Sequence, residues 1–156
     1  MKVSKKMTFD AAHFLHVPSW SREQNLATFH KCSKFKKDGR ETPHGHTYFL
    51  EVTVDGKVDP VTGYVIDFKE LKKIVNDVIE LLDHDCINDL PYFKDKTATA
   101  ENIVQFLWSQ IAPLVNTSTR RLSELKLWET PDSCATFSGD RPRVEIPEPV
   151  VTYINK

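Results

Sequence analysis

Residues 46–55 read HTYFLEVTVD, and this stretch decides the fold. Apolar side chains recur there at every second position from Tyr48 to Val54, which is the alternation of a strand with one buried face. Residues 3–13, VSKKMTFDAAH, carry β-branched and aromatic side chains in partial alternation. The sequence therefore predicts two strands in its first third.

Two amphipathic helices are predicted downstream of these strands. Apolar residues recur at helical spacing over residues 68–82, and Asp67 followed three residues later by Glu70 resembles a capping box. A second helix is predicted to begin after Thr99, a suitable N-cap, and to end near Pro113, because proline interrupts helical hydrogen bonding.

A closing pair of strands completes the predicted order. Residues 122–130 (LSELKLWET) and 133–139 (SCATFSG) are predicted to pair antiparallel around a turn at Pro131 and Asp132. The order is then β-β-α-α-β-β. Strands grouped on both sides of a helical pair indicate an α+β fold, with both helices on one face of an antiparallel sheet.

The length of 156 residues, with 40% hydrophobic content, fits one domain, which we expect in residues 1–140. Two segments lie outside the predicted elements. A loop over about residues 19–43 is longer than a compact domain usually contains without a functional reason. Residues 141–156 form a Pro-rich tail, which its prolines restrict to extended or edge conformations.

Charge and cysteine content exclude several classes of protein. The formal net charge is −1, so no overall attraction to nucleic acid or to an anionic membrane is expected. No apolar run approaches the ~18 residues of a membrane span, and Asp10 and His13 interrupt the apolar start. Cys32, Cys86 and Cys134 are widely separated and odd in number, which argues against a disulfide framework. We expect a cytoplasmic protein without nucleic-acid or membrane partners.

Three histidines form a candidate zinc site. His44 and His46 are two residues apart on a predicted strand, so their imidazoles point to the same face, and Gly45 leaves room between them. His13 ends the first strand, where strand pairing could bring it to the same place. Three neutral imidazoles with an open fourth position are the ligand set of a catalytic zinc. Spacing alone leaves open the alternative of an incidental HxH pattern and a buried core histidine.

The long loop contains two candidate general bases. Cys32 and Glu41 both lie upstream of His44, and either a thiolate or a carboxylate could serve beside a metal. The alternatives are an inert loop cysteine and a solvated glutamate. A basic run suits a phosphate-bearing substrate, although a solvated charged run is the simpler explanation. This run consists of Lys31, Lys34, Lys36, Lys37 and Arg40.

Two further acidic positions are of interest. Asp83 precedes His84 at the end of the first predicted helix, where the carboxylate could orient the imidazole; a helix-terminal histidine interacting with the dipole is the alternative. Glu129 follows Trp128 in a predicted strand, where an acid beside a large apolar residue needs a partner or a ligand unless it is exposed.

With these residues in view, the sequence resembles the 6-pyruvoyltetrahydropterin synthase and 6-carboxytetrahydropterin synthase family, the latter serving queuosine biosynthesis. The similarity runs in order from about residue 8 to residue 139. Its motifs are FDAAH (9–13), KC (31–32), HGHTY (44–48), GKVDPVTGYVIDF (56–68), LDH (82–84), PYF (91–93), TAEN (99–102) and WET (128–130).

This resemblance implies the tunnelling fold, assembled as trimers or hexamers with active sites at subunit interfaces. It implies a zinc ion on the three histidines and a pterin triphosphate, 7,8-dihydroneopterin triphosphate, as substrate. Glu129 would anchor the pterin ring, Thr99 and Glu101 would line its pocket, and Asp83 with His84 would belong to the catalytic relay. The product would be a 6-carboxy- or 6-pyruvoyl-tetrahydropterin.

The sequence departs from the family pattern at the base. Family members place the cysteine about four to six residues before the first histidine of HGH, whereas Cys32 precedes His44 by twelve, across the insertion SKFKKDGRET. Glu41 instead forms ExxHGH, which resembles the branch that cleaves dihydroneopterin to 6-hydroxymethyl-7,8-dihydropterin for folate synthesis. Three hypotheses follow: a synthase with Cys32 as base, a side-chain lyase with Glu41 as base, and a non-catalytic member that binds pterin and metal.

Overall fold

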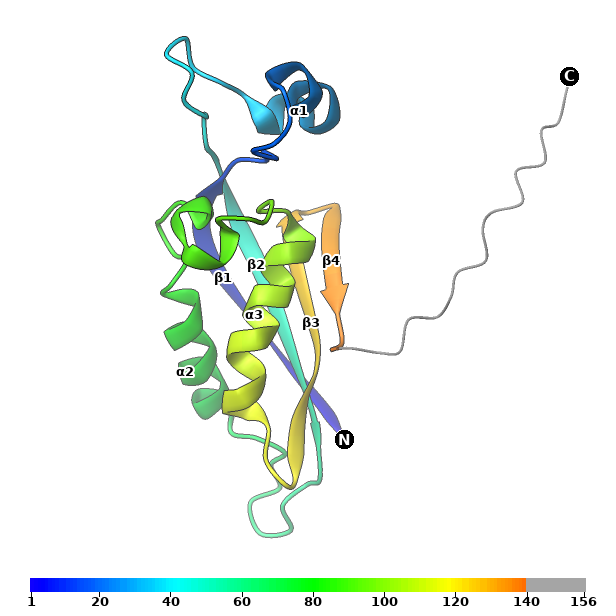
Figure 1. The fold of residues 1–156 in the computed structure, drawn as a ribbon. Helices are drawn as coiled ribbons and strands as arrows, with labels where there is room; N and C mark the ends of the chain where they lie inside the picture. The colour runs from blue at the N-terminus through cyan, green and yellow to red at the C-terminus, as the bar shows by residue number, and fades with distance from the viewer. Residues whose placement is uncertain (140–156) are drawn as a thin grey trace, which may run out of the picture.

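A computed structural model describes residues 1–139 and shows a four-stranded antiparallel sheet in the order β1-β2-β3-β4 (Figure 1). The Pro-rich tail predicted at 141–156 lies outside the described residues. The strands are β1 (Lys2–His13), β2 (His44–Gly56), β3 (Arg120–Thr130) and β4 (Ser133–Phe137). Strands that follow one another in the sequence lie side by side in the sheet, and each of these pairs is antiparallel.

Helices α2 (Phe68–Ile79) and α3 (Ala100–Val115) lie together on one face of the sheet (Figure 1). The predicted α+β arrangement is therefore confirmed. The alternating residues of β2 from Tyr48 to Val54 are fully buried under these helices, as are Leu71 of α2 and Leu107 of α3. Within residues 1–139, no helix is long and apolar enough to cross a membrane.

The segment predicted as a loop over about 19–43 contains a further helix, α1 (Arg22–Phe29), followed by a short 3-10 helix, η1 (His30–Ser33). A complete capping box between Ser21 and Gln24 starts α1. Its only buried residue is Asn25, whose side chain bonds the backbone of Val17 and Ser21. Because a polar residue anchors α1, the sequence contains no apolar stripe from which this helix could be predicted.

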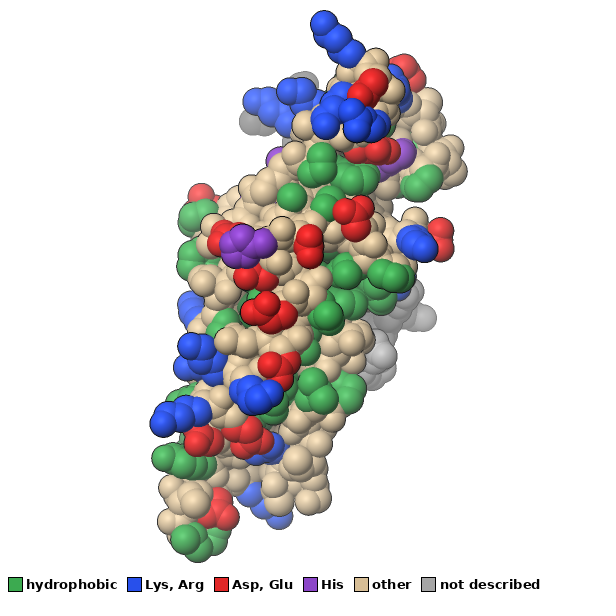
Figure 2. Space-filling model, turned by 90° about the vertical axis from the view of Figure 1, so that its left-hand side faces the viewer, with side chains coloured by type: hydrophobic (Ala, Val, Ile, Leu, Met, Phe, Trp, Pro, Cys, Tyr) green, Lys and Arg blue, Asp and Glu red, His purple; other side chains and the backbone are tan. Residues whose placement is uncertain are grey.

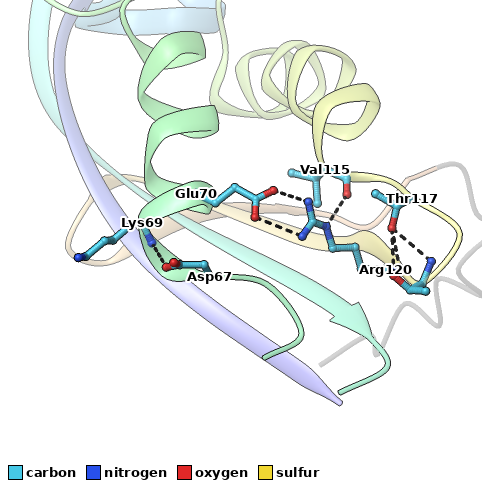
Figure 3. A network of polar contacts seen from close by, with 7 residues as sticks. Asp67, Lys69, Glu70, Val115, Thr117 and Arg120 are labelled. Atoms are coloured by element: carbon cyan, nitrogen blue, oxygen red, sulfur yellow. Dashed lines mark hydrogen bonds and ion pairs between the residues drawn. The ribbon is translucent and has the colours of Figure 1, made fainter. Parts of the chain in front are cut away.

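One local prediction about a helix start was wrong. Asp67 caps α2 by accepting from the Lys69 amide, but Glu70 does not complete a capping box, because its carboxylate pairs with Arg120 on β3 (Figure 3). Helix α3 ends at Val115, two residues after Pro113, so the predicted end near Pro113 is confirmed. The side chain of Val115 is fully buried, and its packing supports the last helical residues beyond a proline that cannot donate a hydrogen bond.

The antiparallel pairing brings three strand ends to the same end of the sheet. His13 at the end of β1 is the register partner of His44 at the start of β2. The end of β3 follows beside β2, since Leu127 pairs with Leu50 and Trp128 with Phe49, and Glu129, two residues after Leu127, shares its helix-covered face. Segments far apart in the sequence therefore supply side chains to one small region.

Candidate metal and substrate site

The three predicted zinc ligands lie together on the helix-covered face of the sheet. His13 pairs with His44, and Ala11 pairs with His46, so the parity of both strands places all three imidazoles on that face. Ring centroids are 4.6 Å apart for His13 and His44, 5.1 Å for His13 and His46, and 4.9 Å for His44 and His46. One nitrogen of each ring lies within 4.8 Å of the others, close enough for a single ion to bind them.

The hydrogen bonding of this cluster fits a metal ion. His13 is buried, and its Nδ1 lies 2.7 Å from the Ala98 carbonyl oxygen, to which it donates. That bond leaves Nε2 of His13 as an acceptor, and this atom, Nδ1 of His44 and Nε2 of His46 are buried without a hydrogen-bond partner. Burial and the neighbouring imidazoles lower the pKa values of His44 and His46, which favours the neutral form that binds metal.

Glu129 faces the same nitrogens. Its Oε1 atom lies 3.1 Å from Nε2 of His13 and 3.7 Å from Nε2 of His46. The His13 contact, partly offset by burial, lowers the pKa of the Glu129 carboxyl. A carboxylate opposite two acceptor nitrogens is favourable only with a cation between them, either a proton or a metal ion. The residues present therefore fit zinc on chemical grounds.

A pocket of about 300 Å³ opens beside Glu129. Thr99 and Glu101, at the start of α3, line it together with Glu129, so the three residues expected to bind substrate meet in one cavity. Thr99 also caps α3, as predicted, by accepting from the Asn102 amide. The other lining residues were not predicted from the sequence. They come from the segment after β1, α1, α3 and β4: Leu15, Phe29, Ala100, Ser133, Cys134 and Ala135.

Cys32 lies in η1, next to the end of β1. Its carbonyl oxygen accepts a hydrogen bond from the Leu15 amide at 2.9 Å, which holds η1 close to the histidine cluster. The thiol is partly buried, and burial together with the negative charge of Glu129 raises its pKa. Cys32 is therefore within electrostatic reach of the candidate site, despite the insertion that follows it.

Glu41 is engaged elsewhere. Its Oε1 atom lies 2.9 Å from Nδ1 of His16, and its backbone forms an isolated bridge with Phe35. It lines a different pocket, which includes Phe14, His16 and Asn88 but none of the three clustered histidines. The structure thus does not bring Glu41 to the candidate metal site within one chain.

Asp83 and His84 lie at the outer edge of β1. Asp83 Oδ1 accepts from the Asp10 amide at 2.8 Å, and Asp83 Oδ2 lies 2.9 Å from Nδ1 of His84. Asp10 alternates with the buried Phe9 and Ala11, so its side chain belongs to the face opposite the histidine cluster. The hydrogen bond from the Asp10 amide and the neighbouring His84 lower the pKa of the Asp83 carboxyl. The predicted pair exists, but not beside the candidate metal site of its own chain.

Tyr48 is a residue whose functional position sequence analysis missed. It was predicted only as a core position of β2, and it is fully buried. Its ring lies 5.6 Å from that of His46 and 6.1 Å from that of His13, and its hydroxyl has no hydrogen-bond partner. Burial and the nearby Glu129 and Cys32 raise its pKa, which favours the neutral hydroxyl.

The pKa of Cys32 provides a first prediction. In metal-free protein, we expect its alkylation by iodoacetamide to rise with pH around a midpoint above that of an ordinary thiol, because burial and Glu129 both disfavour the thiolate. Glu129→Gln removes one of these causes and should lower the midpoint. Mass spectrometry of the Cys32 peptide measures it, and Glu124→Gln on the same strand is the control. An unchanged midpoint in Glu129→Gln would contradict the coupling.

Comparison with known proteins tests the family resemblance independently of this geometry. A family model described as 6-pyruvoyl tetrahydropterin synthase matches residues 2–140. The 6-pyruvoyl tetrahydrobiopterin synthase of Pongo abelii is 35% identical over 141 residues, covering 89% of this chain and 92% of the relative. That of Drosophila melanogaster is 35% identical over 150 residues, covering 95% and 85%. A solved Caenorhabditis elegans 6-pyruvoyl tetrahydropterin synthase is 32% identical with a TM-score of 0.78, covering 90% of this chain and 96% of that one.

Proposed function

Because the chain belongs to the 6-pyruvoyl tetrahydropterin synthase family, we propose that this lyase-type enzyme uses zinc to convert 7,8-dihydroneopterin triphosphate into a 6-pyruvoyl- or 6-carboxy-tetrahydropterin, with release of triphosphate. The names of the relatives favour the 6-pyruvoyl product. One observation carries the proposal: three histidines hold buried, unpartnered nitrogens close together, and those of His13 and His46 face Glu129 at the wall of a pocket large enough for a pterin ring.

In this proposal the pocket residues hold and orient the pterin. The Glu129 carboxylate accepts hydrogen bonds from the N–H groups of the ring. Thr99 and Glu101, at the start of α3, line the same pocket. A ring bound there directs its side chain towards His13, His44 and His46. Zinc on these histidines would supply the Lewis acidity that stabilises negative charge developing on the side-chain oxygens.

Cys32 is the proposed general base. The backbone bond of Cys32 to Leu15, which lines the pocket, brings the residue near a bound pterin, where its thiolate would take a proton from a side-chain carbon. Removal of that proton, with triphosphate leaving as its C–O bond breaks and taking the electron pair, is an elimination. Glu41 is the alternative base of a dihydroneopterin side-chain lyase, but its ion pair with His16 disfavours that role. The third hypothesis, a non-catalytic protein that binds pterin and metal, requires no general base.

Asp83 and His84 would act in an assembled enzyme. They lie at the outer edge of β1 beside Asp10, outside the histidine cluster of their own chain, so a role in proton relay requires a site that combines two copies. We propose a homo-oligomer, a trimer or hexamer, in which this pair approaches the pocket of a neighbouring subunit. The exposure of His84, 78% for the side chain, leaves it available for such a contact.

Product identification tests the proposed function. Zinc-loaded protein is incubated with 7,8-dihydroneopterin triphosphate, and the products are analysed by mass spectrometry under anaerobic conditions. We expect a 6-pyruvoyl- or 6-carboxy-tetrahydropterin and free triphosphate. Formation of 6-hydroxymethyl-7,8-dihydropterin would instead assign the protein to the side-chain lyases. Pterin binding without any product would identify a non-catalytic member.

Glu129→Gln provides a second prediction. The amide keeps the size of the side chain but loses the charge, so the pocket exchanges a charge-assisted hydrogen bond for a neutral one. We expect the Kd for 7,8-dihydroneopterin to rise about 10-fold or more, since hydrogen bonds to charged groups contribute roughly 1.5–3 kcal/mol. Fluorescence titration measures it, with Glu101→Gln as a comparison within the same pocket. An unchanged affinity would show that Glu129 does not anchor the ring.

A further inference from the structure

Residues 34–42, here called the basic hairpin, form a short antiparallel turn between η1 and β2. Phe35 and Glu41 form a backbone bridge, the Lys36 amide donates to the Arg40 carbonyl at 2.7 Å, and the Thr42 amide donates to the Lys34 carbonyl at 2.7 Å. The hairpin projects from the end of the molecule that carries α1 (Figure 1). It contains most of the insertion that separates Cys32 from His44.

Contacts with α1 and with the segment after β1, in the same chain, hold the basic hairpin in place. The Arg22 guanidinium of α1 lies 5.0 Å from the centre of the Phe35 ring, and the His16 ring meets that same ring edge-on at 5.6 Å. Glu41 pairs with His16 at 2.9 Å. Gly39 has a φ of 91°, and a Cβ there would lie 2.6 Å from Arg22 Nη2. The chain therefore adopts a defined turn and not a loose charged loop.

The charge of this end of the molecule is unbalanced. Lys34, Lys36 and Lys37 of the basic hairpin are exposed, as is Lys31 just before it, and Lys and Arg side chains gather there (Figure 2). Among residues 1–139, no carboxylate lies within 4.0 Å of their ammonium groups, whereas Arg40 is paired with Asp38. The carboxylate of Glu41 is already taken by His16. Within the described part of the chain, the four lysines are thus unpaired and available to an anionic ligand.

Both ends of the basic hairpin lead into the candidate site. Cys32 precedes Lys34 by two residues, and His44 follows Thr42, the partner of Lys34, by two residues. Two residues span at most about 7 Å of chain, so the backbone of Lys34 lies close to the proposed base Cys32, and its partner Thr42 lies equally close to the proposed metal ligand His44. Flexible lysine stems can extend ammonium groups from this base over the mouth of the site.

We propose that the basic hairpin binds the triphosphate of the substrate, with Lys34 nearest the reacting carbon and Lys36 and Lys37 towards the distal phosphates. This inference rests on the proposed function, because it assigns the polyphosphate end of that substrate to residues outside the pterin pocket. Point-charge ammonium groups bind phosphate oxygens without demanding one geometry, which suits a group that must leave after the C–O bond breaks. The hairpin would thereby favour the triphosphate over its dephosphorylated form.

Binding measurements on the zinc-loaded protein test this assignment. The triple variant Lys34→Gln, Lys36→Gln and Lys37→Gln is compared with a matched triple variant on the exposed face of α2. Each exposed charge pair contributes roughly 0.2–1 kcal/mol, so we expect the Kd for 7,8-dihydroneopterin triphosphate to rise about 3- to 100-fold in the hairpin variant. The Kd for 7,8-dihydroneopterin should stay within about twofold. The matched control replaces Lys69, Lys72 and Lys73 with Gln.

Inorganic triphosphate serves as the probe that is independent of the reaction. Isothermal titration calorimetry should show weaker binding of it in the hairpin variant and a weaker dependence of affinity on salt. This result would support the inference even if the protein formed no tetrahydropterin. Equal triphosphate affinity in both triple variants would overturn it, as would a parallel loss of 7,8-dihydroneopterin binding, since that loss would give the hairpin a structural role only.

Discussion

His44→Ala is expected to abolish both zinc binding and turnover. The change removes one of three imidazoles whose nitrogens lie within 4.8 Å of one another, and leaves two ligands for the ion. Loss of a residue that only supports a ligand typically costs about 10- to 100-fold in metal affinity, so loss of a ligand should cost more than about 100-fold. Chelator competition measures the affinity, and product analysis measures the turnover.

His16→Ala is the control for that experiment. His16 lies three residues after His13 but contacts Glu41 and Phe35 and none of the clustered imidazoles. Its replacement should leave the zinc content unchanged. Circular dichroism of both variants separates loss of metal from loss of fold. An active, zinc-free His44→Ala protein would remove the proposed metal mechanism.

Cys32→Ala is expected to show the second large effect, with kcat lowered by about 10²- to 10⁴-fold, the range in which a general base contributes. Pterin binding should be retained, because Glu129, Thr99 and Glu101 stay in place. Glu41→Gln should change kcat by only a few-fold, since Glu41 is bound to His16 in a separate pocket. Single-turnover kinetics with 7,8-dihydroneopterin triphosphate measures both variants.

The reverse outcome of this comparison is equally informative. Loss of activity only in Glu41→Gln, with 6-hydroxymethyl-7,8-dihydropterin formed by the unmodified enzyme, would make Glu41 the base and Cys32 a bystander. Cys86→Ala is the control for removal of a thiol, because Cys86 sits at the outer edge of β1, bridged to Ala12. It should retain full activity.

Much of this fold could be predicted from the sequence, because regular elements impose a period on it. The alternation in β2 and the helical spacing in α2 each bury one face, and both predictions are confirmed. Helix α1 could not be predicted in this way. Its one buried residue, Asn25, is polar and is held by hydrogen bonds, so hydrophobic periodicity contains no sign of it.

The candidate site was predictable only where neighbours in the sequence are neighbours in space. His44 and His46 share a face because they are two apart on a strand, which the sequence alone determined. The contact of His13 with them depends on the β1–β2 register, and the contact of Glu129 with the histidines depends on the pairing of β3 with β2. Cross-strand partners are chosen by the packing of the whole sheet, so spacing could suggest these contacts but not establish them.

The tertiary structure separated candidates that the sequence left equivalent. Cys32 and Glu41 both precede the histidines within one loop, but the fold binds η1 to the end of β1 and turns Glu41 towards His16. Asp83 and His84 pair as predicted, yet they are bonded to the backbone of Asp10 at the outer edge of β1 and not to the histidine cluster. The sequence determined which residues can perform the chemistry. Strand parity and long-range hydrogen bonds decided which of them meet, because the face and direction of a side chain depend on contacts far away in the chain.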